Sequence, residues 1–269
     1  MKKFTLILLF VSILFIGKSY SQLYRSSSGE VIFGFADVDN VFNVDSAGNK
    51  EVSDVKNIMR FTLWFHFQQS WHYDFSNNVG VMFGLSMRNI GFITEPEAFY
   101  FHQSNGKLTY YDEDGTGQAR DNKLSKVKQR TYTLGMPLAI KIGNFDKGFY
   151  FFAGGEYEYA FHYKEKVWLD DNKEKYSEWW GDEVTQFLPS VFAGVTFAQG
   201  ATIKFKWYLE NFMNQGYTSK IDGTDIKIKP YEDYNVQLFY VSLAWTISNR
   251  NHCKTTSKSK PKEDKGVQM

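Results

Sequence analysis

Residues 132–142 read YTLGMPLAIKI, and this stretch decides the fold class. Every second residue, from Tyr132 to Ile142, is large and apolar, whereas the residues between them are small, hydroxylated, charged or Pro. Successive side chains of a β-strand point to opposite faces, so a period of two predicts a strand with one apolar and one polar face. An amphipathic helix would instead need apolar residues three and four positions apart.

The same alternation recurs along the chain and predicts eight strands. Seven of them are clear and one, at 30–37, is weaker; the clear ones are 60–68, 79–88, 132–142, 149–162, 187–197, 203–210 and 239–247. The links are alternately long and short. The long links fall near 39–56, 93–128, 164–183 and 215–232, and the short ones near 74–77, 143–148 and 198–200.

This alternation of links predicts how the strands connect. In an antiparallel meander all the long links lie at one end and all the short turns at the other. Outer-membrane barrels have short periplasmic turns and longer outside loops. We therefore predict an all-β, eight-stranded, antiparallel up-and-down transmembrane β-barrel, with both chain termini on the periplasmic side.

A soluble, lipocalin-like barrel is the alternative, and the apolar face separates the two. That face carries bulky rings and aliphatic side chains at nearly every position, too much volume for the narrow interior of eight strands. We therefore expect it to face lipid. Rings also gather at predicted strand ends, as in the aromatic girdles of membrane barrels. They include Trp71, Tyr73, Phe149, Tyr150, Tyr157, Tyr159, Phe161 and Tyr163.

Composition excludes several other classes of protein. The chain has 269 residues with 31 Lys+Arg against 30 Asp+Glu, so it lacks the basic excess of a nucleic-acid binder. Its one Cys excludes a disulfide framework and a Cys-based zinc site. We predict no metal and no cofactor. The acidic run 112–115, with Asp121, lacks EF-hand spacing and is expected to be a solvated loop.

Both ends of the chain differ in composition from the middle. Residues 1–21 combine Lys2 and Lys3, an apolar run from Phe4 to Ile16 and small residues before Gln22, which predicts a secretory signal peptide. The apolar run is too short for a membrane-spanning anchor. We assign 22–250 to the barrel and 251–269, Lys-rich and containing Cys253, to a disordered basic periplasmic tail.

The strand quoted first also carries a family resemblance. Gly135-Met136-Pro137-Leu138-Ala139-Ile140-Lys141 resembles the Pro-Leu-x-x-Lys strand of the small outer-membrane β-barrel proteins of Bacteroidetes, the PorT-like, porin-family group. The cleavage context at 19–22 and the strand–turn–strand piece at 73–81 are similar to theirs. The resemblance covers roughly 57–248 and implies an outer-membrane barrel without a defined activity.

Charged residues on the polar strand faces form the first candidate site. Arg60, Arg88, Glu156, Glu158 and Glu210 are expected at one height in the lumen. Lys141, Lys204 and Lys206, with His66 nearby, are expected closer to the short turns. Enclosed charges must pair, so we predict a structural ladder of salt bridges. The second interpretation is that the lower basic group binds an anion or a periplasmic partner segment.

A second candidate site lies in the longest link. His102, Ser104 and the downstream acid Glu113 resemble the His-x-Ser strand of outer-membrane lipid A deacylases, in which His activates Ser. Here the run falls in a loop, so the leading hypothesis remains a non-catalytic structural or interaction component of the outer membrane. Its expected partners are outer-membrane lipid and envelope or secretion-system proteins, not nucleic acid. The alternatives are a lipid-acting barrel hydrolase and a soluble periplasmic ligand-binding barrel.

Overall fold

The computed structural model describes residues 22–44, 50–52, 55–96, 98–112, 124–169, 172–223 and 226–248. The predicted signal peptide and the predicted tail with Cys253 lie outside the described residues. Sixteen strands occupy the described ranges. Within these ranges there is no α-helix long and apolar enough to cross a membrane.

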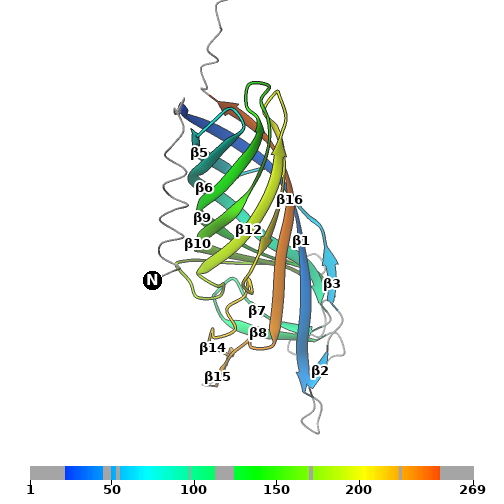
Figure 1. Cartoon of the computed structure of the whole chain (residues 1–269). Coiled ribbons are helices and arrows are strands. Elements are labelled where there is room, and N and C mark those ends of the chain that lie inside the picture. The colour runs from blue at the N-terminus through cyan, green and yellow to red at the C-terminus, as the bar shows by residue number, and fades with distance from the viewer. Residues whose placement is uncertain are drawn as a thin grey trace, which may run out of the picture.

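Eight strands pair into a closed ring (Figure 1). Each runs antiparallel to the next, and the last pairs with the first from Ser26↔Ser248 to Asn40↔Tyr234. In ring order they are β1 (Gln22–Val44), β5 (Phe67–Asp74), β6 (Val79–Pro96), β9 (Leu124–Asn144), β10 (Phe149–Leu169), β12 (Phe187–Thr196), β13 (Ala201–Tyr208) and β16 (Tyr234–Ser248). The predicted all-β, antiparallel up-and-down arrangement is confirmed.

The three short turns lie together at one end of the ring, the upper end in Figure 1, where β1 begins and β16 ends. They join β5 to β6, β9 to β10 and β12 to β13 at the predicted positions. The tightest is closed by hydrogen bonds from the Phe197 amide to the Ala201 carbonyl and from the Gly200 amide to the Phe197 carbonyl, both 2.8 Å. Gly200 has φ +84 there, and a Cβ would lie 2.3 Å from the Thr246 carbonyl oxygen. Glycine therefore fits this turn.

The long links at the other end contain strands of their own. These are β2 (Lys50–Val52), β3 (Val55–Ile58), β4 (Arg60–Thr62), β7 (Ala98–His102), β8 (Leu108–Asp112), β11 (Asn172–Trp179), β14 (Ser219–Lys220) and β15 (Lys227–Ile228). The wall strands also run farther than predicted, since β9 and β10 each have 21 residues. We call residues 124–131 of β9, 162–169 of β10 and all of β11 the loop-side extension.

Two predicted strands differ from the structure. The weak strand at 30–37 is part of β1, which has 23 residues and pairs along most of its length. The predicted strand at 60–68 is broken: 60–62 form β4 and the wall strand β5 begins at Phe67. Phe65 sits in the break with φ +67, a left-handed conformation that interrupts strand alternation.

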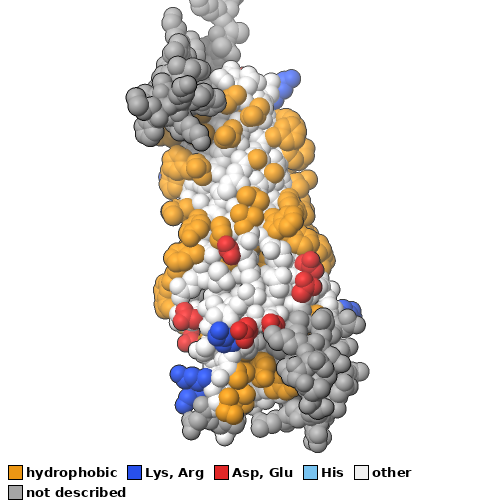
Figure 2. Space-filling view, turned by 60° about the horizontal axis from the view of Figure 1, so that its bottom comes forward, with side chains coloured by type: hydrophobic (Ala, Val, Ile, Leu, Met, Phe, Trp, Pro, Cys, Tyr) orange, Lys and Arg blue, Asp and Glu red, His pale blue; other side chains and the backbone are white. Residues whose placement is uncertain are grey.

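The wall is apolar outside and polar inside. The outward side chains of β9 from Leu134 to Ile142 are 54–63% exposed. The facing inner positions on neighbouring strands hold buried Glu, Lys, Arg, Ser and Thr. Figure 2 shows the apolar side chains spread over the barrel wall, with charged groups gathered toward the loop end of that face. This is the reverse of a soluble barrel, whose apolar face is enclosed.

The loop-side half of the interior is filled by an apolar cluster. It joins the inner faces of six wall strands with segments that follow β11 and β13, through residues such as Phe92, Tyr163, Val184, Leu188, Phe212 and Tyr234. Tyr163 was expected among the outer rings, but the register of β10 shifts between Ala160 and His162 and turns this ring inward, where it is 1% exposed. A second cluster packs Phe99, Phe101 and Tyr111 of the β7–β8 hairpin against Val127, Val167 and Leu169.

Candidate functional site in the barrel lumen

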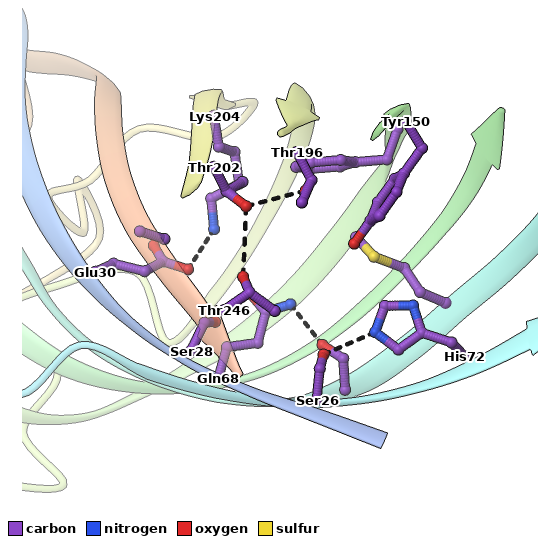
Figure 3. A pocket seen from close by; sticks show the side chains of 14 residues that line it. Ser26, Ser28, Glu30, Gln68, His72, Tyr150, Thr196, Thr202, Lys204 and Thr246 are labelled. Atoms are coloured by element: carbon purple, nitrogen blue, oxygen red, sulfur yellow. Dashed lines mark hydrogen bonds and ion pairs between the residues drawn. The ribbon is translucent and has the colours of Figure 1, made fainter. Parts of the chain in front are cut away.

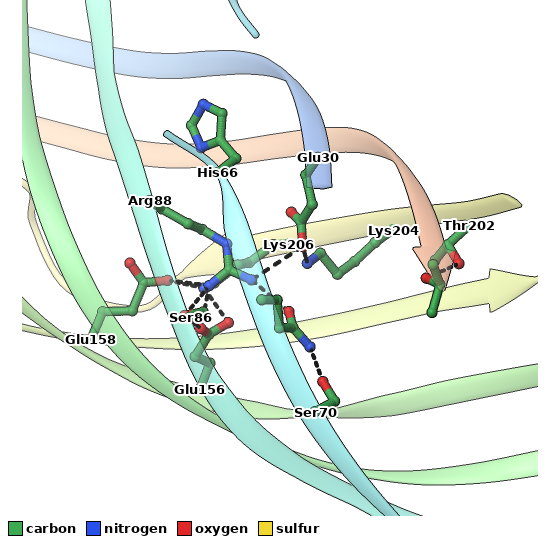
Figure 4. A network of polar contacts seen from close by, with 12 residues as sticks. Glu30, His66, Ser70, Ser86, Arg88, Glu156, Glu158, Thr202, Lys204 and Lys206 are labelled. Atoms are coloured by element: carbon green, nitrogen blue, oxygen red, sulfur yellow. Dashed lines mark hydrogen bonds and ion pairs between the residues drawn. The ribbon is translucent and has the colours of Figure 1, made fainter. Parts of the chain in front are cut away.

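A network of charged side chains crosses the lumen on the short-turn side of the apolar cluster (Figure 4). Four strands contribute to it: β1 through Glu30, β6 through Arg88, β10 through Glu156 and Glu158, and β13 through Lys204 and Lys206. Each of these six residues is at most 5% exposed. The strand period places them inward because the alternate positions carry the apolar outer face.

Arg88 stands at the centre of this network. Its guanidinium pairs with Glu156, lies 3.5 Å from Glu158 Oε1 and 3.3 Å from Glu30 Oε1, and donates to Gln68 Oε1 at 2.8 Å. A planar fork of donors can hold several acceptors at once, which a lysine ammonium cannot do with the same geometry. Arg88 thus connects the carboxylates of β1 and β10 across the lumen.

The two lysines of β13 complete the pairing. Lys204 Nζ lies 2.6 Å from Glu30 Oε1, and Lys206 Nζ lies 2.7 Å from Glu156 Oε2 while also pairing with Glu158. Glu158 also accepts two hydrogen bonds from hydroxyls, from Thr133 at 2.5 Å and from Tyr208 at 3.1 Å. Three cations therefore face three carboxylates, and the group is formally neutral. Such compensation is needed because an unpaired buried charge costs several kcal/mol, of order 3–5.

Lys141 belongs to a different level of the lumen. It pairs with Asp74 and donates to the Tyr24 hydroxyl at 2.7 Å, close to the short turns. Its ammonium also lies 4.4 Å from the Phe145 ring centroid. The side chain is 0% exposed. Lys141 is therefore held near the short-turn end of the barrel, apart from the central network.

Between Lys141 and the central network lies a small hydroxyl-lined cavity (Figure 3). Ser26 and His72 are joined at 2.7 Å, and Thr196 and Thr202 at 2.9 Å. A neighbouring space of about 190 Å³ continues toward Gly148 and Gly200 of the turns. The lumen is thus a shallow polar vestibule at the short-turn end. The charge network, and beyond it the apolar cluster, lie between this vestibule and the loop end.

Comparisons with known proteins leave the family of this chain open. No family model and no curated protein matches it. Among solved structures it is similar to the outer membrane protein AlkL, determined in lipid bilayers, with 14% identity, coverage of 86% of this chain and 93% of that chain, and a TM-score of 0.36.

Two further matches are of the same kind. Neisserial surface protein A is 10% identical, with 84% and 97% coverage and a TM-score of 0.34. The attachment invasion locus protein Ail of Yersinia pestis is 14% identical, with 82% and 99% coverage and a TM-score of 0.29. TM-scores and identities this low carry no argument about activity or partners.

The structure groups the predicted lumen charges differently from the sequence. Lys204 and Lys206 join Arg88, Glu156 and Glu158 in one network, so the two predicted heights merge. Four other predicted residues lie elsewhere, among them Lys141, which pairs with Asp74 near the short turns. Arg60 is buried but donates to Asn89 and Gly91, and His66 accepts the Asn89 amide at 3.4 Å. Glu210 is exposed beyond the end of β13, so its predicted lumen position is wrong.

Sequence reasoning missed Glu30 as a member of the network. Glu30 bridges Lys204 and Arg88 and lies within the strand that was predicted weakly, 30–37. Its neighbours Ser26 and Ser28 face the same cavity. The alternation Ser26, Ser28, Glu30 on the polar face was the available signal. The predicted strand began at Glu30 and left out the two serines that show this alternation.

The structure directs His102 and Ser104 to different partners. The His102 ring stacks on Tyr176 with centroids 4.3 Å apart, and its Nε2 lies 3.1 Å from the Tyr217 hydroxyl. Burial lowers the pKa of His102, which makes it a weaker base. Ser104 is exposed and its Oγ donates to Glu174 at 2.5 Å. Glu113 lies outside the described residues. The pairing that a serine hydrolase requires is not formed here.

Potential metal ligands do not cluster in the described part of the chain. No group of three or more His, Cys, Asp or Glu residues there could hold a metal ion. The acidic run 112–115 and Asp121 lie almost wholly outside the described residues, so the expectation for that loop stays a prediction.

Proposed function

We propose that this chain is a non-catalytic integral protein of the outer membrane, an eight-stranded transmembrane barrel that anchors its loop-side extension at the cell surface. The observation that carries the proposal is the orientation of the wall: Leu138 and its outward neighbours are 54–63% exposed, while Arg88 and Lys206 are at most 1% exposed. Lipid is the medium in which such an arrangement is stable.

The height of the apolar face fits a bilayer. From Leu134 to Ile142 the outward residues of β9 cover roughly 26 Å of strand at about 3.3 Å per residue. At a tilt of about 40° this becomes roughly 20 Å, and with the side chains close to the apolar band of about 25 Å typical of membrane barrels. The remaining residues of β9 then stand outside the membrane at the loop end.

The role that this geometry favours is interaction and not conduction. Arg88 and its partners fill the lumen at mid-height, and the apolar cluster fills it toward the loop end. A porin-like label would therefore describe the fold and not a channel. Membership of the PorT-like group and attachment to an envelope or secretion assembly belong to the same proposal. They are supported by the strand resemblance and by the large loop-side extension available for contacts.

Two measurements test the proposal. Outer-membrane fractionation with alkaline carbonate washing should leave the full-length chain in the pellet and give heat-modifiable migration on gels; release into the supernatant would support the soluble periplasmic barrel instead. In planar bilayers the purified protein should give no steady conductance steps beside a general porin as the positive control. Sustained open steps would contradict the closed lumen.

The hydrolase alternative has a separate test. Release of acyl chains from labelled lipid should be at background for the wild-type chain and unchanged by Ser104→Ala. Release that disappears in this variant would overturn the non-catalytic assignment while leaving the membrane location intact.

A further inference from the structure

The outer face of the loop-side extension carries seven cations on three adjacent strands. β9 contributes Lys126, Lys128 and Arg130, β10 contributes Lys164 and Lys166, and β11 contributes Lys173 and Lys175. We call these seven residues the cationic patch. All are at least partly exposed, and their positions continue the outward face of β9 and β10.

The strand register arranges the patch in rows across the sheet. Lys164 pairs with Arg130 on one side and Ser177 on the other; Lys166 pairs with Lys128 and Lys175. In the next row Trp168 lies between Lys126 and Lys173, whose ammonium groups are 5.0 and 4.7 Å from its ring centroid. Cross-strand neighbours are about 5 Å apart, so like charges stand side by side, an unfavourable arrangement.

The carboxylates that could neutralise the patch are absent from its described surroundings. None of the seven cations forms an ion pair within the described part of the chain. At the β6 border Glu95 is already bound by Lys56 at 2.8 Å. Asp170 and Asp171, next to Lys173 in sequence, lie outside the described residues. The middle rows of the patch are therefore uncompensated by their neighbours.

The titration behaviour of the patch agrees with this. Burial, followed by Arg60, Arg130, Lys166 and Lys126, lowers the pKa of Lys128 to about 8. Burial, followed by Lys173 and three other cations, also lowers the pKa of Lys166. The charged neighbours that shift both lysines are all cations, as expected of a surface shaped to receive an anion.

The patch begins directly beyond a row of rings on the same face. Tyr132 pairs with His162 and His162 with Trp179, with ring centroids 5.3 and 4.3 Å apart. Trp179 is 62% exposed, and next to Tyr132 the apolar outer face starts at Leu134. Exposed Trp and Tyr rings of this kind mark the membrane–water interface. Apolar face, rings and cations therefore follow one another along the same strands.

This order places the first row of cations at the height of lipid headgroups. Two residues of strand advance about 6.6 Å, or about 5 Å along the membrane normal at a tilt of about 40°. The row of Arg130 and Lys164 then stands about 5 Å and the row of Lys128 and Lys166 about 10 Å beyond the rings. The headgroup layer is about 5–8 Å thick on each side of a typical bilayer, so the first row stands within it and the second just outside it. Long lysine side chains of the second row can point back toward the phosphates.

We propose that the cationic patch binds the phosphate groups of anionic lipids in the leaflet at the loop end of the barrel. The inference rests on the proposed membrane-spanning function and adds a ligand class and a site to it. A lipid is favoured over a soluble polyanion because the patch is continuous with the apolar face and the ring row. One molecule can therefore place its acyl chains on the wall and its phosphate among the lysines.

Tryptophan quenching by brominated lipids tests this proposal in reconstituted bilayers. The wild-type chain should prefer brominated phosphatidylglycerol over brominated phosphatidylcholine by at least about fivefold at low salt, given the usual attraction of a surface lysine to anionic lipid. At 1 M salt, where the Debye length falls to about 3 Å, the preference should approach one.

Variants with matched charge changes make the test specific. Combining Lys128→Gln, Arg130→Gln, Lys164→Gln and Lys166→Gln should bring the preference close to one. The matched control combines Lys107→Gln, Lys220→Gln, Lys227→Gln and Lys229→Gln, exposed lysines outside the patch, and should keep the wild-type preference. Equal loss in both variants, or no loss in the first, would overturn the proposal.

Two further readouts distinguish a failure of the lipid-binding proposal from a failure of the proposed membrane-spanning function. Carbonate resistance and heat-modifiable migration report membrane insertion. A wild-type chain that does not insert would contradict the proposed function itself. Titration with inorganic phosphate and with heparin reports soluble anions. If these bind through the four central residues while lipid preference is absent, the patch serves a soluble polyanion and the lipid assignment is wrong.

Discussion

The lumen network and the cationic patch are both rich in charge, but the charges of the first are paired and buried, whereas those of the second are of one sign and exposed. In the lumen, Arg88, Lys204 and Lys206 face three carboxylates, and every one of these groups is almost fully buried. On the loop-side extension, seven cations lie next to one another without a carboxylate from the described residues. Both groups lie on the same strands or their neighbours.

The difference follows from access to solvent. A charge enclosed by the barrel cannot be hydrated, so it must be neutralised within the chain. An exposed charge is hydrated and screened, so like charges side by side cost less than they would in the lumen and stay available to an external anion. Compensated charge thus indicates structure, and uncompensated charge indicates a binding surface.

The largest expected effect comes from removing one cation from the neutral lumen network. Arg88→Met leaves Glu30, Glu156 and Glu158 with two cations, so we expect a loss of about 3–5 kcal/mol in the free energy of unfolding. Urea titration of the detergent- or liposome-folded protein measures it. The control is Lys56→Met, which removes an exposed pair with Glu95 and should cost at most about 1 kcal/mol. Equal costs for the two variants would contradict the contrast.

The next effect concerns where an outward charge is tolerated. Leu138→Arg places a cation in the middle of the apolar face and should cost about 2–4 kcal/mol in lipid. Ser177→Arg adds a cation on the same outward side but within the rows of the patch, where we expect less than about 0.5 kcal/mol. Reversible folding into liposomes measures both. A small cost at Leu138 would mean that this face does not meet hydrocarbon.

The sequence predicted the wall well because its signal is local. Alternation at Leu134–Ile142 and the turns at 74–77, 143–148 and 198–200 depend on neighbouring residues, and the structure places these turns as expected. The break at Phe65 and the register shift after Ala160 depend instead on how a strand fits its partners. For that reason the inward turn of Tyr163 and the start of β5 were missed.

The site was predicted in part for a related reason. Strand parity identified Arg88, Glu156, Glu158, Lys204 and Lys206 as inward, but their heights depend on the stagger between strands, which sequence does not show. Glu210 fell outside because β13 ends at Tyr208, two residues earlier. The cationic patch was not foreseen, since its rows form only when β9, β10 and β11 are in register.

A third prediction measures how strongly the lumen charges act as a unit. Lys204→Met leaves Glu30 with Arg88 as its remaining cation, whereas the double variant with Glu30→Gln removes both partners of a 2.6 Å pair. The free energy of unfolding should therefore fall in the double variant by about 1–3 kcal/mol less than the sum of its falls in the two single variants. A double-mutant cycle in urea gives this coupling. Strict additivity would show that the two residues are independent.

The smallest expected effect is a pH dependence of the patch. The folded-state pKa of Lys128 is lowered to about 8 from its ordinary value of 10.5, so between these pH values the unfolded chain binds more protons than the folded one. Stability should therefore rise with pH across that window, because deprotonation relieves the cost of burying the ammonium and then the repulsion within the patch. In zwitterionic bilayers Lys128→Gln should reduce this rise relative to the wild-type chain, which isolates Lys128 from other titrating groups.

Anionic bilayers should reverse the behaviour and so join this prediction to the proposed lipid site. Phosphate beside Lys128 favours its charged form, raises its folded-state pKa toward the ordinary value and flattens the rise in stability above pH 8. Urea midpoints of wild-type chain and Lys128→Gln, measured between pH 7 and 10 in the two lipids, provide the comparison. The same slope in both lipids would mean that no phosphate reaches the patch, however well the barrel is inserted.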